Sequence, residues 1–188
     1  MKTENVYAFP ISLRIFSKYR NFSKGVPTHR IYLGKGEYKG KIYDESNAVD
    51  FGAPVGTNVF CAYSGKVVKV FNKTEKNWKD IWSAPPEGYF SDTSEQYGNH
   101  VIVQSGNEFS WYCHLKFNSI VVSEGQEVKK GDLVGKVGRT GISLKPHLHF
   151  QVTIPREKWL RHGYYTPEIR WEDEESAKRY IQRFSIKK

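Results

Sequence analysis

Apolar and polar residues alternate in short runs between residues 50 and 152, and turn residues separate the runs. Residues 99–106 read NHVIVQSG and residues 108–117 read EFSWYCHLKF, both rich in β-branched and aromatic side chains. Runs of this length with a period of two are typical of β-strands. The sequence therefore predicts an all-β fold, organised as a compact antiparallel β domain.

Glycines interrupt residues 121–141, and this segment is expected to form very short strands joined by tight turns. Residues 72–96 are polar, contain a Pro-Pro pair and are predicted to be a long surface insertion. Near the C-terminus acidic residues precede basic ones, which favours a helix that packs on the β domain. The apolar face of this helix would comprise Ala177, Tyr180, Ile181 and Phe184.

We therefore predict three parts in the chain. An N-terminal extension, residues 1–46, packs on the core; residues 47–152 form the β domain with its insertion; and residues 153–188 form a C-terminal extension with a helix.

Composition limits the function classes. The chain has 188 residues, of which 38% are hydrophobic and 15% aromatic, enough for one folded domain. Its formal net charge of +9 favours polyanionic surroundings, but the basic residues are scattered and match no nucleic-acid-binding motif, so no nucleic-acid partner is expected. We find no signal peptide and no apolar run long enough for a membrane span, and expect a soluble, unexported chain. Cys61 and Cys113 are expected to be buried thiols.

Candidate chemistry begins with SLKPHLHFQV, residues 143–152. In a strand, His147, His149 and Gln151 would share one face, directed away from the core. The same alternation places Tyr112 and His114 on one face of their strand and Cys113 on the other, pointing away from the histidines.

Four segments occur in a characteristic order: NAVDFGAPVGTNVFCAYSGKVV, YGNHVIVQSG, WYCHL and GKVGRTGISLKPHLHF. Together they resemble the lysostaphin-type (LytM-like) zinc metallopeptidases, which cut peptide bonds in bacterial peptidoglycan. The resemblance covers residues 47 to 152 and implies a β domain of the duplicated hybrid motif type. It also implies a bound zinc ion, peptidoglycan peptides as partners, and a place in the cell wall or outside the cell.

The resemblance assigns roles to individual residues. Asp50 and His149 match zinc ligands, His114 matches the catalytic histidine of the family's Tyr-x-His-Leu segment, and His147 matches a second active-site histidine. Zinc polarises a peptide carbonyl and lowers the pKa of water toward ~7, while imidazoles with a pKa near ~6.5 can shuttle a proton. The expected chemistry is metal-assisted hydrolysis of an amide bond.

One position departs from the family pattern. The first zinc ligand is commonly a histidine four residues before the aspartate, and Ser46 stands there. His29, Asp44 or Glu45 would then supply the third ligand, or the site is degenerate and binds wall peptides or a partner without cutting them. His100 and His162 match no motif and are interpreted as structural.

Three further expectations concern the substrate groove, the oligomeric state and the glycine-rich segment. Trp78, Trp82 and Tyr89 are candidates for the walls of a substrate groove, and the chain is expected to be a monomer. The segment VSEGQEVKKGDLVGKVG has glycine-rich turns like those of biotinyl or lipoyl carriers, but no lysine lies in the turn that such carriers modify.

Overall fold

The computed structural model describes residues 1–12, 35–38, 41–45, 47–78, 95–155 and 163–178. Nearly all regular structure in these residues is β, which confirms the predicted all-β class. The strands are β1 Lys2–Tyr7, β2 Lys35–Tyr38, β3 Lys41–Asp44, β4 Val49–Gly52, β5 Asn58–Phe60, β6 Gly65–Phe71, β7 Asn77–Trp78, β8 Asn99–Ser105, β9 Glu108–Leu115, β10 Glu127–Val128, β11 Leu133–Lys136, β12 Gly141–Ile142, β13 His147–Pro155, β14 Gly163–Tyr165 and β15 Glu168–Trp171, with a 3-10 turn at Glu95–Tyr97.

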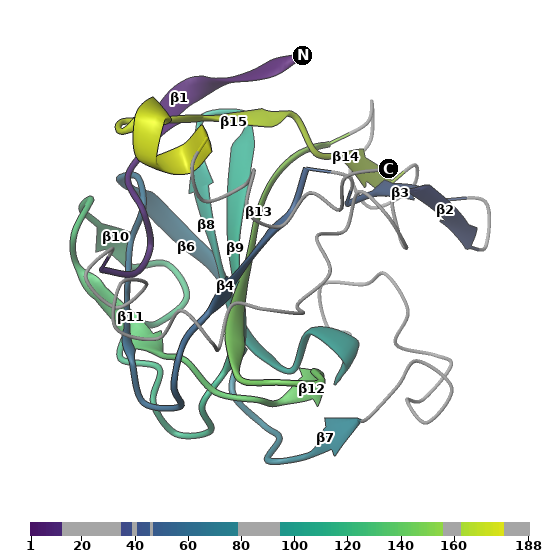
Figure 1. Ribbon diagram of the computed structural model, residues 1–188, viewed down its shortest axis with the longest axis vertical. Helices are drawn as coiled ribbons and strands as arrows, with labels where there is room; N and C mark the ends of the chain where they lie inside the picture. Colours follow the sequence, from purple (N-terminus) through teal and green to yellow (C-terminus); the bar gives the residue numbers. More distant parts are fainter. Residues whose placement is uncertain (13–34, 39–40, 46, 79–94, 156–162, 179–188) are drawn as a thin grey trace.

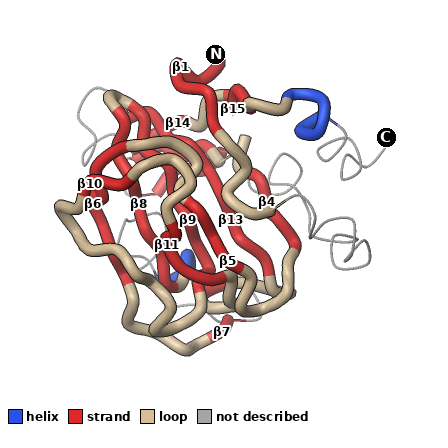
Figure 2. The backbone as a smooth tube through the Cα atoms, turned by 90° about the vertical axis from the view of Figure 1, so that its left-hand side faces the viewer, coloured by secondary structure: helices blue, strands red, loops and turns tan. Residues whose placement is uncertain are grey.

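The central sheet has the strand order β10-β6-β8-β9-β13-β14-β3-β2, and β4 also pairs with β13 (Figures 1 and 2). The long strands β6, β8, β9 and β13 run antiparallel to their neighbours. His149 on β13 pairs with Asp50 on β4 and with Cys113 on β9. Residues about one hundred positions apart in the chain thus meet at one point of the sheet.

Parallel pairing also occurs in the described part of the chain, which the antiparallel prediction did not include. β1 pairs with β15, β3 with β14 and β7 with β12, all in parallel. The β1–β15 pair joins the beginning of the chain to residues near its end (Figure 1). The β7–β12 pair attaches the start of the insertion to the loop that precedes β13.

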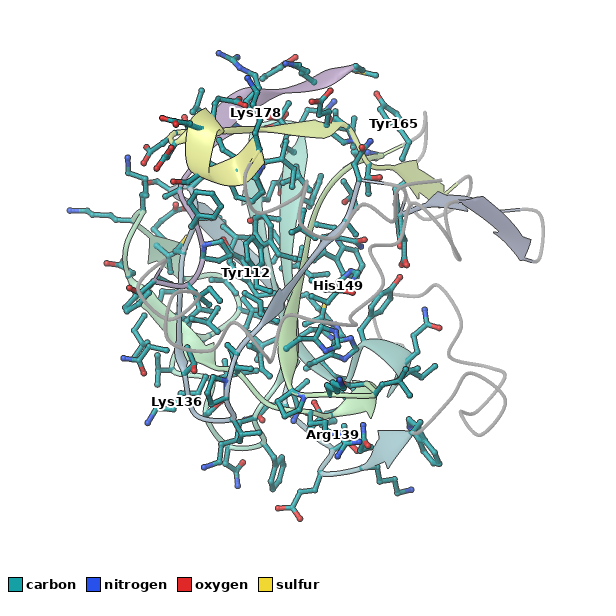
Figure 3. All side chains as sticks on the ribbon, viewed as in Figure 1. Tyr112, Lys136, Arg139, His149, Tyr165 and Lys178 are labelled. Carbon is teal, nitrogen blue, oxygen red and sulfur yellow. The ribbon has the colours of Figure 1, made fainter. Side chains whose placement is uncertain are left out.

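The two faces of β13 belong to different environments. Leu148, Phe150 and Val152 lie in the main hydrophobic core, together with Tyr112. His147, His149 and Gln151 occupy the other face, as the period of two predicts, and in Figure 3 Tyr112 and His149 lie on opposite sides of β13. This polar face is buried, because a second apolar cluster packs beside it. That cluster comprises Tyr97, Ile102, Phe109, Trp111, Cys113 and Tyr164.

The prediction that Cys113 points away from the histidines is wrong. Cys113 pairs directly with His149, and opposed residues of an antiparallel pair share a face. Burial raises the pKa of the Cys113 thiol well above its usual value, and the charges of Glu45 and Asp50 add to this effect. Tyr112, in contrast, lies in the main core, with its hydroxyl accepting the backbone N–H of Ala62 at 2.8 Å.

A β-bulge near the end of β9 explains why alternation failed there. Leu115 pairs with Asn99 and Tyr112 with Val101, so three steps along β9 match two along β8. His114 lies within this interval and has a φ of 60°. A bulge adds one residue to a strand and so changes the face to which the following side chains point. Here Leu115 lies in the main core, and His114 points to the same face as His147 and His149.

The segments outside the central strands follow the prediction in part. Residues 174–178 are helical and Ala177 is buried, whereas Tyr180, Ile181 and Phe184 lie outside the described residues. Within the insertion the structure describes residues 72–78 and 95–96, and Trp82 and Tyr89 lie outside this part. Among the described residues no helix has the length and apolar character needed to cross a membrane. Both cysteines are buried and free, as predicted.

Candidate active site

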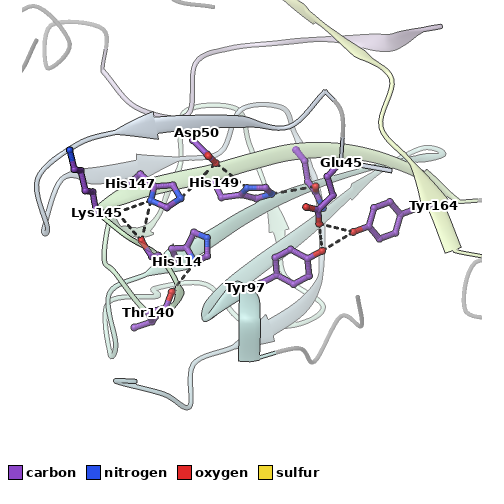
Figure 4. A network of polar contacts seen from close by, with 11 residues as sticks. Glu45, Asp50, Tyr97, His114, Thr140, Lys145, His147, His149 and Tyr164 are labelled. Atoms are coloured by element: carbon purple, nitrogen blue, oxygen red, sulfur yellow. Dashed lines mark hydrogen bonds and ion pairs between the residues drawn. The ribbon is translucent and has the colours of Figure 1, made fainter. Parts of the chain in front are cut away.

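Asp50 and His149 form the centre of the candidate site. Their backbones are paired across β4 and β13, and Asp50 Oδ1 lies 3.0 Å from His149 Nδ1 (Figure 4). Both side chains are buried. Pairing of neighbouring strands therefore places a carboxylate oxygen beside an imidazole nitrogen, and the structure brings together the two residues that the sequence predicts as metal ligands.

His147 precedes His149 by two residues on β13, and the two side chains share one face of the strand. Its Nδ1 donates to the backbone carbonyl of Lys145 at 2.7 Å and lies 3.1 Å from Ser143 Oγ. Because a carbonyl can only accept, Nδ1 carries a proton, and in the neutral ring Nε2 presents a lone pair. That Nε2 is 3.7 Å from Asp50 Oδ1, so the imidazole faces the same carboxylate as His149 does.

His114 completes a cluster of three imidazoles. Its ring centroid lies 4.7 Å from that of His147 and 5.9 Å from that of His149. Nδ1 donates to the backbone carbonyl of Thr140 at 2.8 Å, which leaves the lone pair on Nε2. Burial, followed by the neighbouring His147 and His149, lowers the pKa of His114 well below its usual value. His114 is thus a neutral imidazole, suited to accepting a proton.

Thr140 is held against the end of β9 by close backbone packing. Its hydroxyl donates to the Leu115 carbonyl and accepts the Asn99 N–H, both at 2.9 Å. A Cβ on Gly98 would lie 2.4 Å from the Thr140 backbone, and one on Gly141 would lie 2.3 Å from the Gly98 nitrogen. Both glycines have positive φ, so only residues without a side chain allow this approach, which fixes the carbonyl that orients His114.

A buried polar cluster adjoins His149 on the side away from Asp50. His149 Nε2 is 3.3 Å from Gln151 Oε1. Beyond Gln151, the hydroxyls of Tyr97 and Tyr164 lie 2.8 Å apart, and both contact Glu45 Oε1 (Figure 4). Sequence reasoning placed Gln151 on this face but missed the two tyrosines, because nothing in the sequence brings residues 97 and 164 together.

The donor set fits zinc. Zinc sites use imidazole nitrogen and carboxylate oxygen, the two atom types that meet between His149 and Asp50. His149 Nδ1 faces the carboxylate oxygen and Nε2 faces Gln151 Oε1, so Nδ1 is the ring nitrogen that a metal shared with Asp50 would use. Two electron-rich atoms at 3.0 Å are stabilised by a cation or a proton between them.

A third ligand is not found among the described residues, which contain no group of three metal-ligating side chains. Glu45 Oε1 instead contacts the Tyr97 and Tyr164 hydroxyls. His29, Ser46 and the side chain of Asp44 lie outside the described part.

Two histidines, His100 and His162, match no motif in the sequence. His100 is buried, stacks on Phe71 with 5.4 Å between ring centroids, and has Nδ1 2.8 Å from the Gly98 carbonyl. These contacts agree with a structural role. His162 lies outside the described residues.

Comparison with known proteins gives a match to one family. The model of the family described as Peptidase family M23, a metallopeptidase family, matches residues 44–160. Peptidoglycan DD-endopeptidase ShyA of Vibrio cholerae serotype O1 is 31% identical over 109 residues, which are 57% of this chain and 20% of that protein. Lysostaphin of Staphylococcus simulans is 36% identical over 104 residues, 55% of this chain and 17% of that protein.

The matched segments make up less than a quarter of each of these relatives. Among solved structures, a zinc containing peptidase from Vibrio cholerae superposes with a TM-score of 0.51 at 22% identity, covering 88% of this chain and 40% of that chain. At this identity the likeness concerns the fold, and it agrees with the all-β architecture.

Proposed function

Because the chain belongs to peptidase family M23, we propose that it is a zinc-dependent endopeptidase that cleaves peptide bonds in bacterial peptidoglycan. The observation that carries the proposal is the convergence of the Asp50–His149 pair with the imidazoles of His114 and His147. The names of the relatives ShyA, a peptidoglycan DD-endopeptidase, and lysostaphin support this substrate class.

Asp50 and His149 would hold the metal through Oδ1 and Nδ1. Bound zinc supplies Lewis acidity, which polarises a peptide carbonyl and makes hydroxide available near neutral pH. The carbonyls of Lys145 and Thr140 hold the Nδ1 protons of His147 and His114, so both rings keep Nε2 as the proton acceptor.

The two imidazoles would divide the proton transfers of amide hydrolysis. One Nε2 accepts a proton from the attacking water, and the protonated ring then donates to the departing amine nitrogen. The other ring takes up a proton at Nε2 from solvent before the reaction and donates it as a hydrogen bond to the carbonyl oxygen, whose negative charge it stabilises. Burial of His114 favours its neutral form before the reaction begins.

A second candidate function is binding without cleavage. Ser46 occupies the position of a common family ligand, and the described residues hold no group of three metal-ligating side chains. If no residue compensates, zinc binds weakly and the face of His114, His147 and His149 serves to bind wall peptides or a regulatory partner.

Digestion of purified peptidoglycan separates the two functions. Mass spectrometry of the soluble fragments is expected to show new amino termini with the wild-type protein and added zinc, and none after chelation or with His114→Ala. His162→Ala, which removes a histidine that no motif assigns to the site, is the matched control and should retain cleavage. Binding to the wall without new termini under any of these conditions would favour the second function.

Other expectations stay predictions. These are the division into residues 1–46, 47–152 and 153–188, the insertion at 72–96, a monomeric state, a groove walled by Trp78, Trp82 and Tyr89, and a location in the cell wall or outside the cell. Of the three aromatic residues, Trp78 lies one residue away from the candidate site. Its carbonyl accepts the N–H of Ser143 at 3.3 Å, and the Ser143 hydroxyl contacts His147.

A further inference from the structure

The loop of residues 143–145 determines how the His147 ring lies. His147 Nδ1 donates to the Lys145 carbonyl at 2.7 Å and lies 3.1 Å from the Ser143 hydroxyl, which itself donates to the Lys145 carbonyl at 2.7 Å. This contact holds the imidazole in either charge state, because Nδ1 carries the hydrogen in the neutral ring described above and in the protonated ring. A shift of the Lys145 carbonyl would therefore move the ring relative to His114, whose centroid is 4.7 Å away.

This loop lies at the surface of the protein. Leu144 is 64% exposed, and Lys145 is exposed as well. The Ser143 N–H donates to the Trp78 carbonyl at 3.3 Å, and the Ser143 carbonyl accepts the Asn77 side-chain amide at 2.9 Å. Both of these contacts are at the first residue of the loop, so the position of the residues that follow depends on further contacts.

Arg139 supplies a contact beyond the first residue. Its Nε donates to the Ser143 carbonyl at 3.3 Å, and its Nη2 donates to the Leu144 carbonyl at 2.8 Å. A guanidinium group is planar and its donors have a fixed separation, so one side chain holds two successive carbonyls in place. The single ammonium group of a lysine, on a flexible chain, does not provide this fixed pair of donors.

The backbone that carries Arg139 is anchored to the end of β9. The Gly138 N–H donates to the His114 carbonyl at 3.0 Å, and a Cβ on Gly138 would lie 2.6 Å from a backbone carbon of β9. The residue after Arg139 is Thr140, whose carbonyl orients His114 (Figure 4). Arg139 thus extends from fixed backbone beside His114 to the exposed loop that orients His147.

We propose that Arg139 is a positioning residue: its guanidinium holds the carbonyls of the exposed loop and so keeps the His147 ring in place beside His114. This inference rests on the proposed function, in which the two rings take part in one hydrolysis. A misplacement of about 1 Å in an active site can lower the rate roughly 100-fold. The main effect of losing Arg139 is therefore expected in kcat and not in substrate affinity.

Steady-state cleavage of soluble peptidoglycan fragments tests this role. Arg139→Ala is expected to lower kcat roughly 10 to 100 fold with little change in KM, because the ring is displaced while the substrate still binds. Arg139→Lys, which can reach one carbonyl, should have an intermediate kcat. Free guanidinium ion, added well below the concentration that unfolds the protein, should restore part of the kcat of Arg139→Ala, which it would not do after a general loss of stability.

Arg170→Ala is the matched control. Arg170 is also an exposed arginine whose guanidinium donates to a backbone carbonyl, that of Glu4 at 3.0 Å, but it belongs to the β1–β15 pair. Its replacement should leave kcat unchanged. Should Arg139→Ala fail to fold, Arg139→Lys carries the same test.

Nuclear magnetic resonance without substrate gives a readout that does not depend on activity. The wild-type protein is expected to show nuclear Overhauser contacts between the ring hydrogens of His114 and His147. In Arg139→Ala these contacts should weaken relative to those between Tyr97 and Trp111, whose ring centroids lie 5.4 Å apart in the second apolar cluster.

The outcomes separate this inference from the proposed function. A raised KM with unchanged kcat in Arg139→Ala would overturn positioning and assign the residue to substrate binding. Unchanged contacts between the two imidazole rings, or an equal loss of kcat in Arg170→Ala, would also overturn it. A wild-type protein that cleaves no fragments contradicts the proposed function, whereas the ring contacts still decide the role of Arg139, because they are measured without substrate.

Discussion

The left-handed backbone of His114 leads to a prediction about stability with an unusual sign. In most of a β-strand, glycine is less stable than alanine by roughly 0.5 to 1 kcal/mol because it loses more conformational freedom on folding. At His114 the φ of 60° reverses the order, since a Cβ in that conformation costs about 1 to 2 kcal/mol. His114→Gly should therefore be more stable than His114→Ala by about 0.5 to 1 kcal/mol.

Cys113 is the matched control, because it is the preceding residue of β9, is equally buried and does not have a positive φ. There Cys113→Ala should be more stable than Cys113→Gly by roughly 0.5 to 1 kcal/mol. Comparing glycine with alanine at each site removes the contribution of the lost imidazole or thiol, which is the same in both variants. The difference between the two sites is then about 1 to 2 kcal/mol of backbone strain.

Equilibrium unfolding in urea measures the four free energies, with equal denaturant slopes required for the comparison. Both His114 variants should also lose peptidoglycan cleavage. Alanine at 114 as stable as glycine, or the same order at both positions, would refute the idea that the bulge strains the backbone at His114. The predicted reversal would indicate that a histidine occupies a position where glycine suits the backbone, and that strain at a functional site is retained for its chemistry.

Further predictions concern the metal and the loop beside it. If position 46 lacks a ligand, Ser46→His should tighten zinc by at least 10 to 100 fold in chelator competition, because even partners of ligands have roughly that effect; unchanged or weaker binding would contradict a vacant position. If another residue fills it, His29→Ala or Glu45→Ala should remove the metal instead, and retention of zinc by both variants would exclude those two residues as ligands. Gly98→Ala should lower the free energy of unfolding by about 1 to 3 kcal/mol, because its Cβ meets the Thr140 backbone at 2.4 Å, and urea unfolding with no change would contradict that close approach.

The sequence predicts the β class and the approximate strands because alternation and turn residues are local signals. It also identifies Asp50, His114, His147 and His149, whose motifs resemble the lysostaphin-type family, and the family match confirms that resemblance. The structure brings all four together.

Alternation failed at Cys113 because a bulge changes the parity of a strand, and no residue in WYCHL marks the bulge: a histidine, and not a glycine, has the positive φ. The cluster of Tyr97, Tyr164 and Glu45 could not be predicted either. Its members come from a 3-10 turn, from β14 and from the residue after β3, and only tertiary packing sets their distances.

The central claim is that Asp50 and His149 hold a zinc ion beside the imidazoles of His114 and His147. Native mass spectrometry of protein purified without chelator and supplied with zinc tests it most directly, with Asp50→Asn as the near-isosteric comparison and His114→Ala as a variant that keeps both ligands. The claim predicts one zinc ion per chain in the wild-type protein and in His114→Ala, and none in Asp50→Asn. A wild-type chain that stays free of zinc, or zinc retained in full by Asp50→Asn, would contradict it.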